Sequence, residues 1–368
     1  MSQPQQKGFM SKIFSPTLVL GEQVVTRSMV VQQEVHDVSS SQKSATGHEV
    51  FCVRYSPDGQ VGYASYRIES VDHQFQFIAA SRGNGEIDIY STVNGNKNSS
   101  KTKNVLLSVN ANGLVKHWHM TSMKCLHTIN EDPNQCYALD YRADGLKFAT
   151  AGQDHQVRIY DEATKTLQST LTGGYGRTRA GHSNRVFSLK FSTDDENLLL
   201  SAGWDNTIQV STWPPFDLRA FQSLIPIMVW DIRMDVPCRS VFGTHITGDS
   251  IDLYDNYIVS GSWRPENQLQ LWDLRTCTLL KNYNWTNASH PCLLYGTQFS
   301  KDVGATYIIA GGSGANEARL YKRESGEQVG VVLGMKQGVY SVDFHPSKSQ
   351  VAIASGDGTV RLIDYQRE

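Results

Sequence analysis

The sequence predicts an all-β protein built from repeated units of short antiparallel strands, and two observations support this. Residues 181–205 contain a Gly-His pair, an apolar run, a polar turn at 193–196, and a second apolar run that ends in Ser-Ala-Gly-Trp-Asp. Two short apolar runs joined by a polar turn are typical of paired antiparallel strands. The second observation is that the same pattern of residue types recurs along the chain. A sequence repeat of this kind indicates a fold built from repeated structural units.

The first half of each unit is a strand with a fixed order of residue types. That order is apolar, aromatic, small, aliphatic, polar and aromatic. It is found in HEVFCVRY (48–55), NQCYALDY (134–141), NRVFSLKF (184–191) and QGVYSVDF (337–344). A strand of this kind therefore opens several units along the chain.

The second half of each unit is a hairpin with constant spacing. Its turn lies six residues before a closing aromatic residue or Ile in four pairs: Asn84 and Tyr90, Asn112 and Trp118, Asp154 and Tyr160, Asp357 and Ile363. A constant offset fixes the register, because a slip of one residue would turn every side chain to the wrong face. Seven units end near Tyr90, Trp118, Tyr160, Trp230, Trp272, Tyr321 and Ile363, close to 42 residues apart where undisturbed. This period is typical of four short strands per unit.

These features resemble the WD-repeat family over about residues 47–365. The residues that carry the resemblance are Gly47-His48, Gly181-His182, Ser201 with Asp205, Trp230-Asp231 and Trp272-Asp273. The resemblance implies a seven-bladed β-propeller of four-stranded antiparallel sheets, with an incomplete second blade. It also implies a structural hydrogen-bond set of His, Ser, Asp and Trp, which only the fourth unit holds complete, as His182, Ser201, Asp205 and Trp230. We expect the other blades to use apolar packing, because a buried polar network must be satisfied or absent.

The expected domain organisation is a disordered tail at 1–17, an N-terminal segment at 18–46, and the propeller at 47–368. The β-branched residues 23–35 are predicted to supply the outer strand of the last blade, because little chain follows the strand at 359–363. This pairing would remove an open sheet edge.

Three places depart from the repeat. Residues 60–76 and 211–228 are inserted, and residues 91–104 must hold two strands although they are rich in Asn, Ser and Lys. Pro214, Pro215 and Pro226 argue against the second insert extending a strand. Two explanations remain: genuine elaborations of the fold, or retained and skipped coding segments, which sequencing of the transcript would separate.

Composition excludes several function classes. The formal net charge is −2 and the pI about 6.6, so no strong field favours nucleic acid, and the small cluster of Lys97, Lys101 and Lys103 has no interleaved aromatic residue. No apolar run reaches the roughly 18 residues that span a membrane. Six scattered cysteines without a C-x-x-C pair predict reduced thiols and a cytoplasmic protein, with the nucleus as an alternative.

The sequence shows no catalytic motif. Phosphate-loop, nucleophile-elbow and H-E-x-x-H patterns are missing, and the glycines at 311–314 fall on a strand corner that opens no helix. His117 and His119 share a strand face, but no third metal ligand lies near them in sequence. We therefore expect no enzyme, metal, cofactor or small-molecule substrate. A propeller enzyme is the least favoured alternative, since the repeats place small residues in the channel: Cys52, Ala138, Ser188 and Ser341.

The remaining prediction is a recognition surface. In the family that this sequence resembles, loops converge on one rim of the channel, which would carry Arg82, Asn84, Gln153, His155, Asn184, Arg185, Trp204, Trp263, Arg264 and Glu317. Trp204 and Trp263 lie in polar turns between strands, where a large indole side chain is not expected if the turn only faces solvent. Tryptophan and arginine are the residues that contribute most to binding at protein interfaces. The predicted partner-binding residues are Trp204, Trp263, Arg264, Arg82, His155 and Arg185. The alternative is that these indoles pack over neighbouring blades.

The predicted function is a non-catalytic scaffold that binds protein partners through this rim, and membership of a multi-protein complex is a further expectation. A second alternative comes from the W-D-x-R pattern at 230–233 and 272–275, which resembles a box in substrate receptors of cullin–RING ubiquitin ligases. The resemblance implies that Arg233 and Arg275 contact the ligase adaptor. An arginine at this position is also common in ordinary repeats, where it caps the turn.

Overall fold

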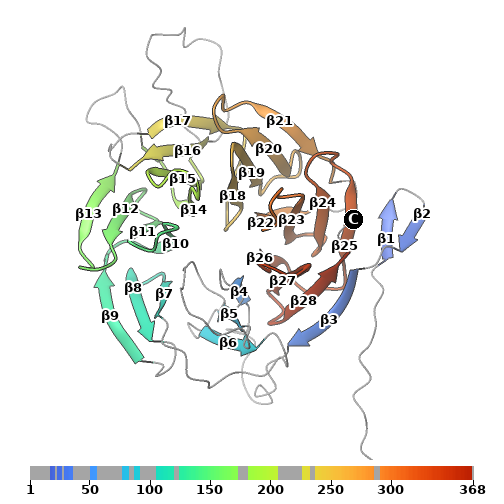
Figure 1. The fold of residues 1–368 in the computed structure, drawn as a ribbon, viewed down its shortest axis with the longest axis horizontal. Coiled ribbons are helices and arrows are strands. Elements are labelled where there is room, and N and C mark those ends of the chain that lie inside the picture. The colour runs from blue at the N-terminus through green and yellow to red at the C-terminus, as the bar shows by residue number, and fades with distance from the viewer. Residues whose placement is uncertain are drawn as a thin grey trace, which may run out of the picture.

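The computed structural model describes residues 17–20, 23–26, 29–35, 50–55, 77–82, 87–91, 105–119, 124–172, 181–205, 226–232, 237–285 and 291–366. Side chains are described from residue 106 onward, apart from β16 and most of β17. In these ranges the regular elements are β-strands, and every sheet is antiparallel. The sheets are arranged around a central axis as a β-propeller (Figure 1). The all-β prediction is therefore confirmed.

Five sheets are four-stranded blades, named A to E in chain order. Blade A has β10 (Cys136–Tyr141), β11 (Lys147–Gly152), β12 (Val157–Asp161) and β13 (Leu167–Leu171). Blade B has β14 (Val186–Phe191), β15 (Leu198–Gly203), β16 (Pro226–Asp231) and β17 (Pro237–Phe242). Blade C has β18 (Ile251–Tyr254), β19 (Tyr257–Gly261), β20 (Leu269–Asp273) and β21 (Leu279–Tyr283). Blade D has β22 (Leu293–Phe299), β23 (Tyr307–Ser313), β24 (Ala318–Lys322) and β25 (Gln328–Val332).

Blade E closes the ring with strands from both ends of the chain. It contains β26 (Val339–Phe344), β27 (Gln350–Ser355), β28 (Val360–Tyr365) and β3 (Met29–Val35). β3 pairs antiparallel with β28, so the expected closing strand is present. It is shorter than predicted, because β2 (Gln23–Thr26) pairs instead with β1 (Thr17–Leu20). This small hairpin lies outside the ring beside β25 (Figure 1).

Two sheets have three strands in the described residues. They are β4 (Val50–Tyr55), β5 (Phe77–Arg82) and β6 (Ile87–Ser91), and β7 (Val105–Val109), β8 (Leu114–His119) and β9 (Lys124–Asn130). The prediction of seven four-stranded blades is therefore wrong, since five blades have four strands. The outer strand after β6 and the inner strand before β7 would both fall within 92–104, outside the described residues. That segment is rich in Asn, Ser and Lys, which disfavour strands.

The inserted segments fall largely outside the described residues, which omit 1–16, 56–76 and 206–225. The second insert nevertheless contributes to blade B, because β16 begins at Pro226 and pairs with β15 and β17. Pro226 is the first residue of β16, a position that proline tolerates within a sheet.

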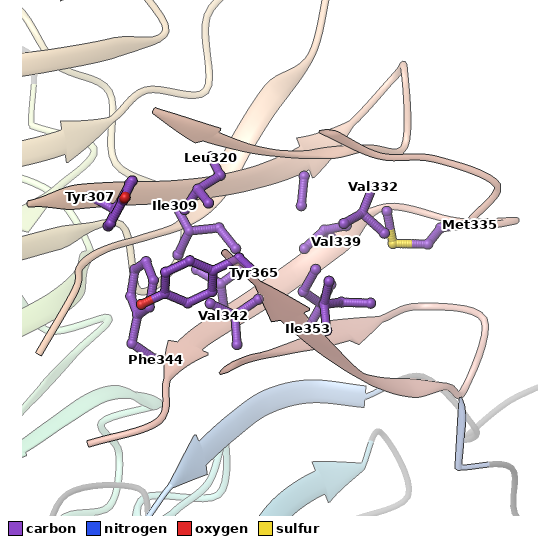
Figure 2. Close-up of a cluster of buried hydrophobic side chains, with 13 residues drawn as sticks. Tyr307, Ile309, Leu320, Val332, Met335, Val339, Val342, Phe344, Ile353 and Tyr365 are labelled. Carbon is purple, nitrogen blue, oxygen red and sulfur yellow. The ribbon is translucent and has the colours of Figure 1, made fainter. Parts of the chain in front are cut away.

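The hydrophobic core lies between neighbouring blades. Figure 2 shows the cluster between blades D and E, in which Tyr307 and Ile309 of β23 face Phe344 of β26 and Tyr365 of β28. The ring of Tyr365 meets those of Tyr307 and Phe344 edge-on, at centroid distances of 5.4 and 5.7 Å. Similar clusters join blades A and B, B and C, and C and D. Because blades A to D each bury both faces against their neighbours, they form a rigid support for their loops.

The three-stranded sheet β7–β9 is attached to blade A by a buried polar contact. His117 Nε2 lies 3.2 Å from Glu162 Oε2, and the Tyr141 hydroxyl donates to the same oxygen at 2.8 Å. Burial alone would raise the pKa of Glu162. The hydrogen bonds from His117, Lys165 and Tyr141 outweigh burial, so the pKa lies below its ordinary value and the carboxylate stays charged.

Candidate functional site: an aromatic row on the rim

The inner strands of the sheets share a β-bulge at one aromatic position. Pairing to the next strand shifts by one residue at Phe51, Tyr137, Phe187, Tyr295 and Tyr340. A bulge leaves its residue unpaired in the ladder and redirects the side chain. The side chains of the last four of these residues are described, and all four are half-buried. Each bulge therefore places a ring where the inner strand enters the sheet.

Trp204 is positioned by a close backbone approach at the end of β15. A Cβ on Gly203 would lie 1.9 Å from the carbonyl oxygen of Arg185, so only glycine fits there. The Trp204 amide donates to the same oxygen at 2.9 Å. The indole N–H of Trp204 donates to Thr247 Oγ1 at 3.0 Å, which fixes the side chain against the loop that leads into blade C.

Five rings form a continuous row across blades A, B and C, here called the aromatic row: Tyr137, Phe187, Trp204, His245 and Trp263. Their successive centroid distances are 4.9, 5.0, 5.6 and 6.2 Å. Tyr137 stacks on Phe187 at 12°, and Trp204 stacks on His245 at 16°. The row ends at Trp263, which is 37 % exposed. Such spacings are typical of favourable aromatic pairs, so the row is a preorganised surface.

Two arginines flank the aromatic row. Arg185 lies over the Trp204 ring, with its guanidinium carbon 5.8 Å from the centroid, and Arg264 Nη1 donates to the Gly243 carbonyl at 3.5 Å. Neither arginine forms an ion pair with another described residue. Burial, and then the charge of Arg264, lower the pKa of His245, while the Asp205 carboxylate acts in the opposite direction. The site therefore combines aromatic rings with two arginines and one buried carboxylate.

The structure brings together four of the six residues predicted to bind a partner: Trp204, Trp263, Arg185 and Arg264. His155 occupies the turn between β11 and β12 with φ 68°, and no ring contact joins it to the row in the described residues. Arg82 ends β5, and its side chain lies outside the described residues. Because Trp204 packs on Thr247 and His245 of the next blade, the alternative of indoles lying over neighbouring blades also fits this residue.

The sequence prediction missed Tyr137, Phe187 and His245. The signal for the first two was present, because an aromatic residue stands second in each of the four inner-strand segments. In a regular strand, an aromatic residue at that position would not be expected to contact a ring of another blade. The bulges redirect these side chains, so that rings of neighbouring blades meet. His245 lies in the loop before β18 and has no counterpart in the repeat.

The residues of the predicted hydrogen-bond set in blade B lie at the core of the sheet. His182 Nδ1 lies 2.6 Å from Asp205 Oδ2, and its Nε2 lies 2.6 Å from Ser201 Oγ. The Trp230 side chain lies outside the described side chains, although its backbone pairs with Leu199. The Ser–His–Asp order is that of a nucleophilic triad. Ser201 and Asp205 are fully buried, so a substrate cannot reach the hydroxyl, and the three groups act as a structural link.

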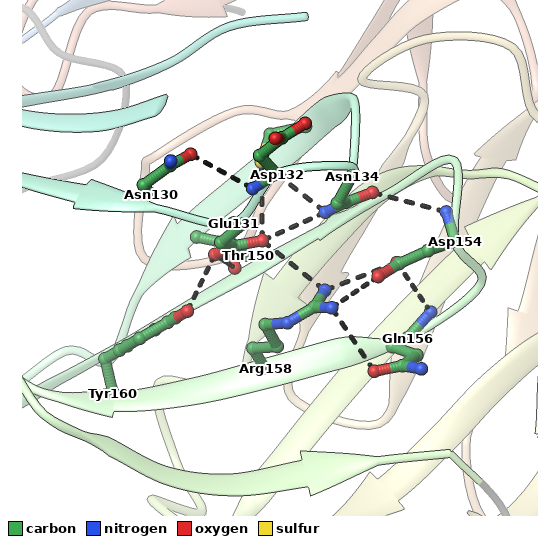
Figure 3. Close-up of polar contacts among 10 residues, drawn as sticks. Asn130, Glu131, Asp132, Asn134, Thr150, Asp154, Gln156, Arg158 and Tyr160 are labelled. Atoms are coloured by element: carbon green, nitrogen blue, oxygen red, sulfur yellow. Dashed lines mark hydrogen bonds and ion pairs between the residues drawn. The ribbon is translucent and has the colours of Figure 1, made fainter. Parts of the chain in front are cut away.

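Blade A contains a charged version of the same link, shown in Figure 3. Glu131 precedes Thr150 by 19 residues, as His182 precedes Ser201. Glu131 Oε1 accepts from the Thr150 and Tyr160 hydroxyls at 2.6 and 2.9 Å. Arg158 pairs with both Glu131 and Asp154. The expectation that incomplete blades depend on apolar packing is therefore wrong for blade A, where arginine balances the two carboxylates.

The residues of the W-D-x-R pattern have different environments. In blade C the Trp272 indole is buried and donates to Ser260 Oγ at 2.8 Å. Arg275 is exposed in the turn between β20 and β21, at the opposite end of β20 from Arg264. Arg233 lies outside the described residues. Trp272 therefore has a structural role, and the surface position of Arg275 leaves it accessible to a partner.

In the described residues, no group of three or more His, Cys, Asp or Glu side chains is placed to hold a metal ion. The described part of the chain also contains no helix long and apolar enough to cross a membrane.

A family model for the WD domain, G-beta repeat, matches residues 123–161, 173–210 and 326–364. The chain is 23% identical to "Protein tipD" of Dictyostelium discoideum over 63% of this chain and 32% of that protein. It is 21% identical to eukaryotic translation initiation factor 3 subunit I of Nematostella vectensis, over 67% of this chain and 85% of that protein. It is 21% identical to "Cell division cycle 20.5, cofactor of APC complex" of Arabidopsis thaliana, over 64% and 57%.

The alignments span about a third of tipD and less than two thirds of the Arabidopsis protein. The first match runs from β9 to β12 of blade A, the second contains β14 and β15 of blade B, and the third runs from β25 of blade D into β28 of blade E. The prediction of WD repeats is thereby confirmed. The matches and the ring of antiparallel blades together identify the chain as a WD-repeat β-propeller protein.

Proposed function

We propose that this protein is a non-catalytic scaffold that binds protein partners through the rim of its propeller. The observation that carries the proposal is the aromatic row with its two flanking arginines. Tryptophan and arginine supply the largest share of binding energy at protein interfaces, because they offer a large contact area and directional donors. The row is held by bulged strands and by the Gly203 contact, so little side-chain freedom remains to be lost on binding.

Two relatives support protein partners rather than a small-molecule substrate. Their names describe a subunit of a translation initiation factor and a cofactor of the APC complex, and both descriptions refer to multi-protein assemblies. The described cysteines are free thiols, which fits the proposal that the protein acts in the cytoplasm or nucleus. The identity of the partner does not follow from these similarities.

The test is a double substitution, Trp263→Ala with Arg264→Ala. Partners are first identified by affinity purification of the full chain, and direct binding of each partner is then measured with purified components. We expect a loss of at least about tenfold in affinity, because Trp and Arg contacts at interface centres each contribute about 2 kcal/mol or more. The melting temperature should stay within about 2 °C, because exposed side chains contribute little to stability.

Lys124→Ala with Leu126→Ala is the matched control, since both residues are exposed on β9. This control removes a cation and an apolar side chain from the outer surface and should leave binding unchanged. If the rim variant lowers the melting temperature as strongly as it lowers affinity, Trp263 and Arg264 are structural and the proposal fails.

The second candidate function is the substrate receptor of a cullin–RING ubiquitin ligase. One observation favours it: Arg275 is exposed in its turn while Trp272 of the same motif is buried. Copurification of the ligase adaptor, abolished by Arg233→Ala with Arg275→Ala, would support this role. Adaptor binding that survives the double substitution would exclude the W-D-x-R contact.

A further inference from the structure

We propose that the aromatic row binds an extended, acidic peptide segment of a partner protein. This inference rests on the proposed rim function and specifies the chemistry of the partner. Three observations carry it: the length of the row, the stacking of its rings, and the two arginines.

The dimensions of the row fit an extended segment. Four ring-to-ring steps of 4.9 to 6.2 Å join Tyr137 to Trp263. The row is therefore on the order of 20 Å long, which an extended chain covers with about six residues at ~3.3 Å per residue. A helix would need more than twice as many residues for the same distance. An extended segment therefore spans the row with fewer residues than a helix does.

The ring stacking decides which surface a ligand can reach. Phe187 lies between Tyr137 and Trp204, and Trp204 lies between Phe187 and His245. Stacking covers one face each of Tyr137, Phe187, Trp204 and His245, whereas Phe187 and Trp204 meet at 44°. The edge of an aromatic ring carries the positive part of its quadrupole, while the face carries the negative part. A stacked face is closed to a cation, whereas a ring edge can meet a carboxylate or a carbonyl oxygen.

The same stacking argues against single-stranded nucleic acid as the ligand. Proteins that bind single strands offer free aromatic faces on which bases stack, within a strongly positive groove. Here one face of each of four rings is closed by stacking, and the positive charge that the described residues place beside the rings comes from Arg185 and Arg264. A chain with a formal net charge of −2 also supplies little general attraction for phosphates.

The charges beside the row complement an acidic segment. Arg185 and Arg264 form no ion pair with other described residues, so their guanidinium groups can accept a carboxylate without breaking an existing pair. Each forms strong, charge-assisted hydrogen bonds with such a partner. Glu266, exposed in the same turn as Arg264, would oppose it. Removing this charge should strengthen binding.

The experiment measures fluorescence anisotropy of labelled probes with the full-length chain. Three peptides of about six residues alternate Leu with Glu, with Gln or with Lys, and the fourth probe is an oligouridylate of similar length. We expect the Glu peptide to bind about tenfold more tightly than the Gln peptide, and its affinity to fall as salt is raised. The Lys peptide and the oligouridylate should bind more weakly than either.

Charge-only substitutions test the assigned residues while keeping the rings in place. Arg185→Gln and Arg264→Gln should each weaken the Glu peptide about fivefold or more, and Glu266→Gln should strengthen it. Arg275→Gln is the matched control, because it removes the same charge at the opposite end of β20 and should change affinity less than twofold. Melting curves of each variant verify that the fold is retained.

Equal affinity for the three peptides, tighter binding of the oligouridylate, or weaker binding by Glu266→Gln would each overturn the inference. These outcomes are separate from failure of the rim function itself. If Trp263→Ala with Arg264→Ala still abolishes partner binding, the rim stays an interface, but for a partner of other chemistry.

Discussion

Position 131 shows how one residue changes the chemistry of a whole blade. In blade B the equivalent residue is His182, which shares its two ring nitrogens between Asp205 and Ser201. In blade A, Glu131 adds a second negative charge beside Asp154, and Arg158 lies between them. Burial and the Glu131 charge both raise the pKa of Tyr160, so its hydroxyl remains protonated and donates to Glu131. The network is satisfied, as a buried network must be.

Glu131→Ala is expected to destabilise the protein by about 3–5 kcal/mol, because it leaves Arg158 buried with half of its compensation removed. Arg158→Met alone should cost a similar amount, and the double substitution less than the sum of the two. Chemical unfolding of all four proteins in a double-mutant cycle gives the coupling energy. Glu196→Ala is the control, since its exposed carboxylate lies 3.9 Å from Arg142 and should contribute at most about 0.5 kcal/mol. Additive effects of the two buried substitutions would contradict the network.

The third strand of blade B has two candidate sequences. The structure uses Pro226–Asp231, whereas the WD repeat match ends at residue 210, after TIQV at 207–210. Deleting residues 207–225 would leave DNPIMVWD, and deleting residues 211–229 would leave DNTIQVWD. Both shortened versions place the Trp six positions after Asp205, the same offset as from Asp154 to Tyr160. The insert is therefore flanked by two interchangeable strand sequences.

Both deletions are expected to fold, with melting temperatures equal to or above that of the full chain, because a shorter loop costs less closure entropy. Circular dichroism and thermal melting check this, and the two variants control for each other because they remove the same number of residues. If only the deletion of 207–225 folds, the strand is specified by residues 226–229, and the second sequence cannot replace it.

Closure of the propeller depends on the pairing of β3 with β28. Without β3, the last blade would present an open edge with unpaired backbone groups, which promotes self-association. Blade E also contributes half of the core cluster in Figure 2, so its loss would expose apolar side chains. The stability of the ring is therefore a property of the whole chain.

Deletion of residues 1–35, which removes β3, should lower the melting temperature by at least about 5 °C and produce concentration-dependent association. Deletion of residues 1–28 is the control, because it removes only the β1–β2 hairpin and keeps β3. Differential scanning fluorimetry and light scattering measure the two effects. A full chain and a 1–35 deletion with equal melting temperatures would show that β3 does not close the ring.

The sequence alone determined the repeat, the antiparallel hairpins and the closing strand. Fixed spacings such as Asp154 to Tyr160 report local pairing, and alternation of side chains sets the register. The repeat and the hairpins were accessible because they depend on residues near one another in the chain. The placement of Trp204, Trp263, Arg185 and Arg264 at one rim followed from the loop arrangement that the WD-repeat resemblance implies.

Only the tertiary structure decided which strands complete each sheet and which side chains meet between blades. In the described residues five sheets have four strands and two have three, and composition alone does not fix this count. The aromatic row joins Tyr137, Phe187 and His245 to the two tryptophans through bulges and a loop that no local pattern specifies. Contacts between units depend on how the sheets are arranged around the axis, and that arrangement results from packing of the whole ring.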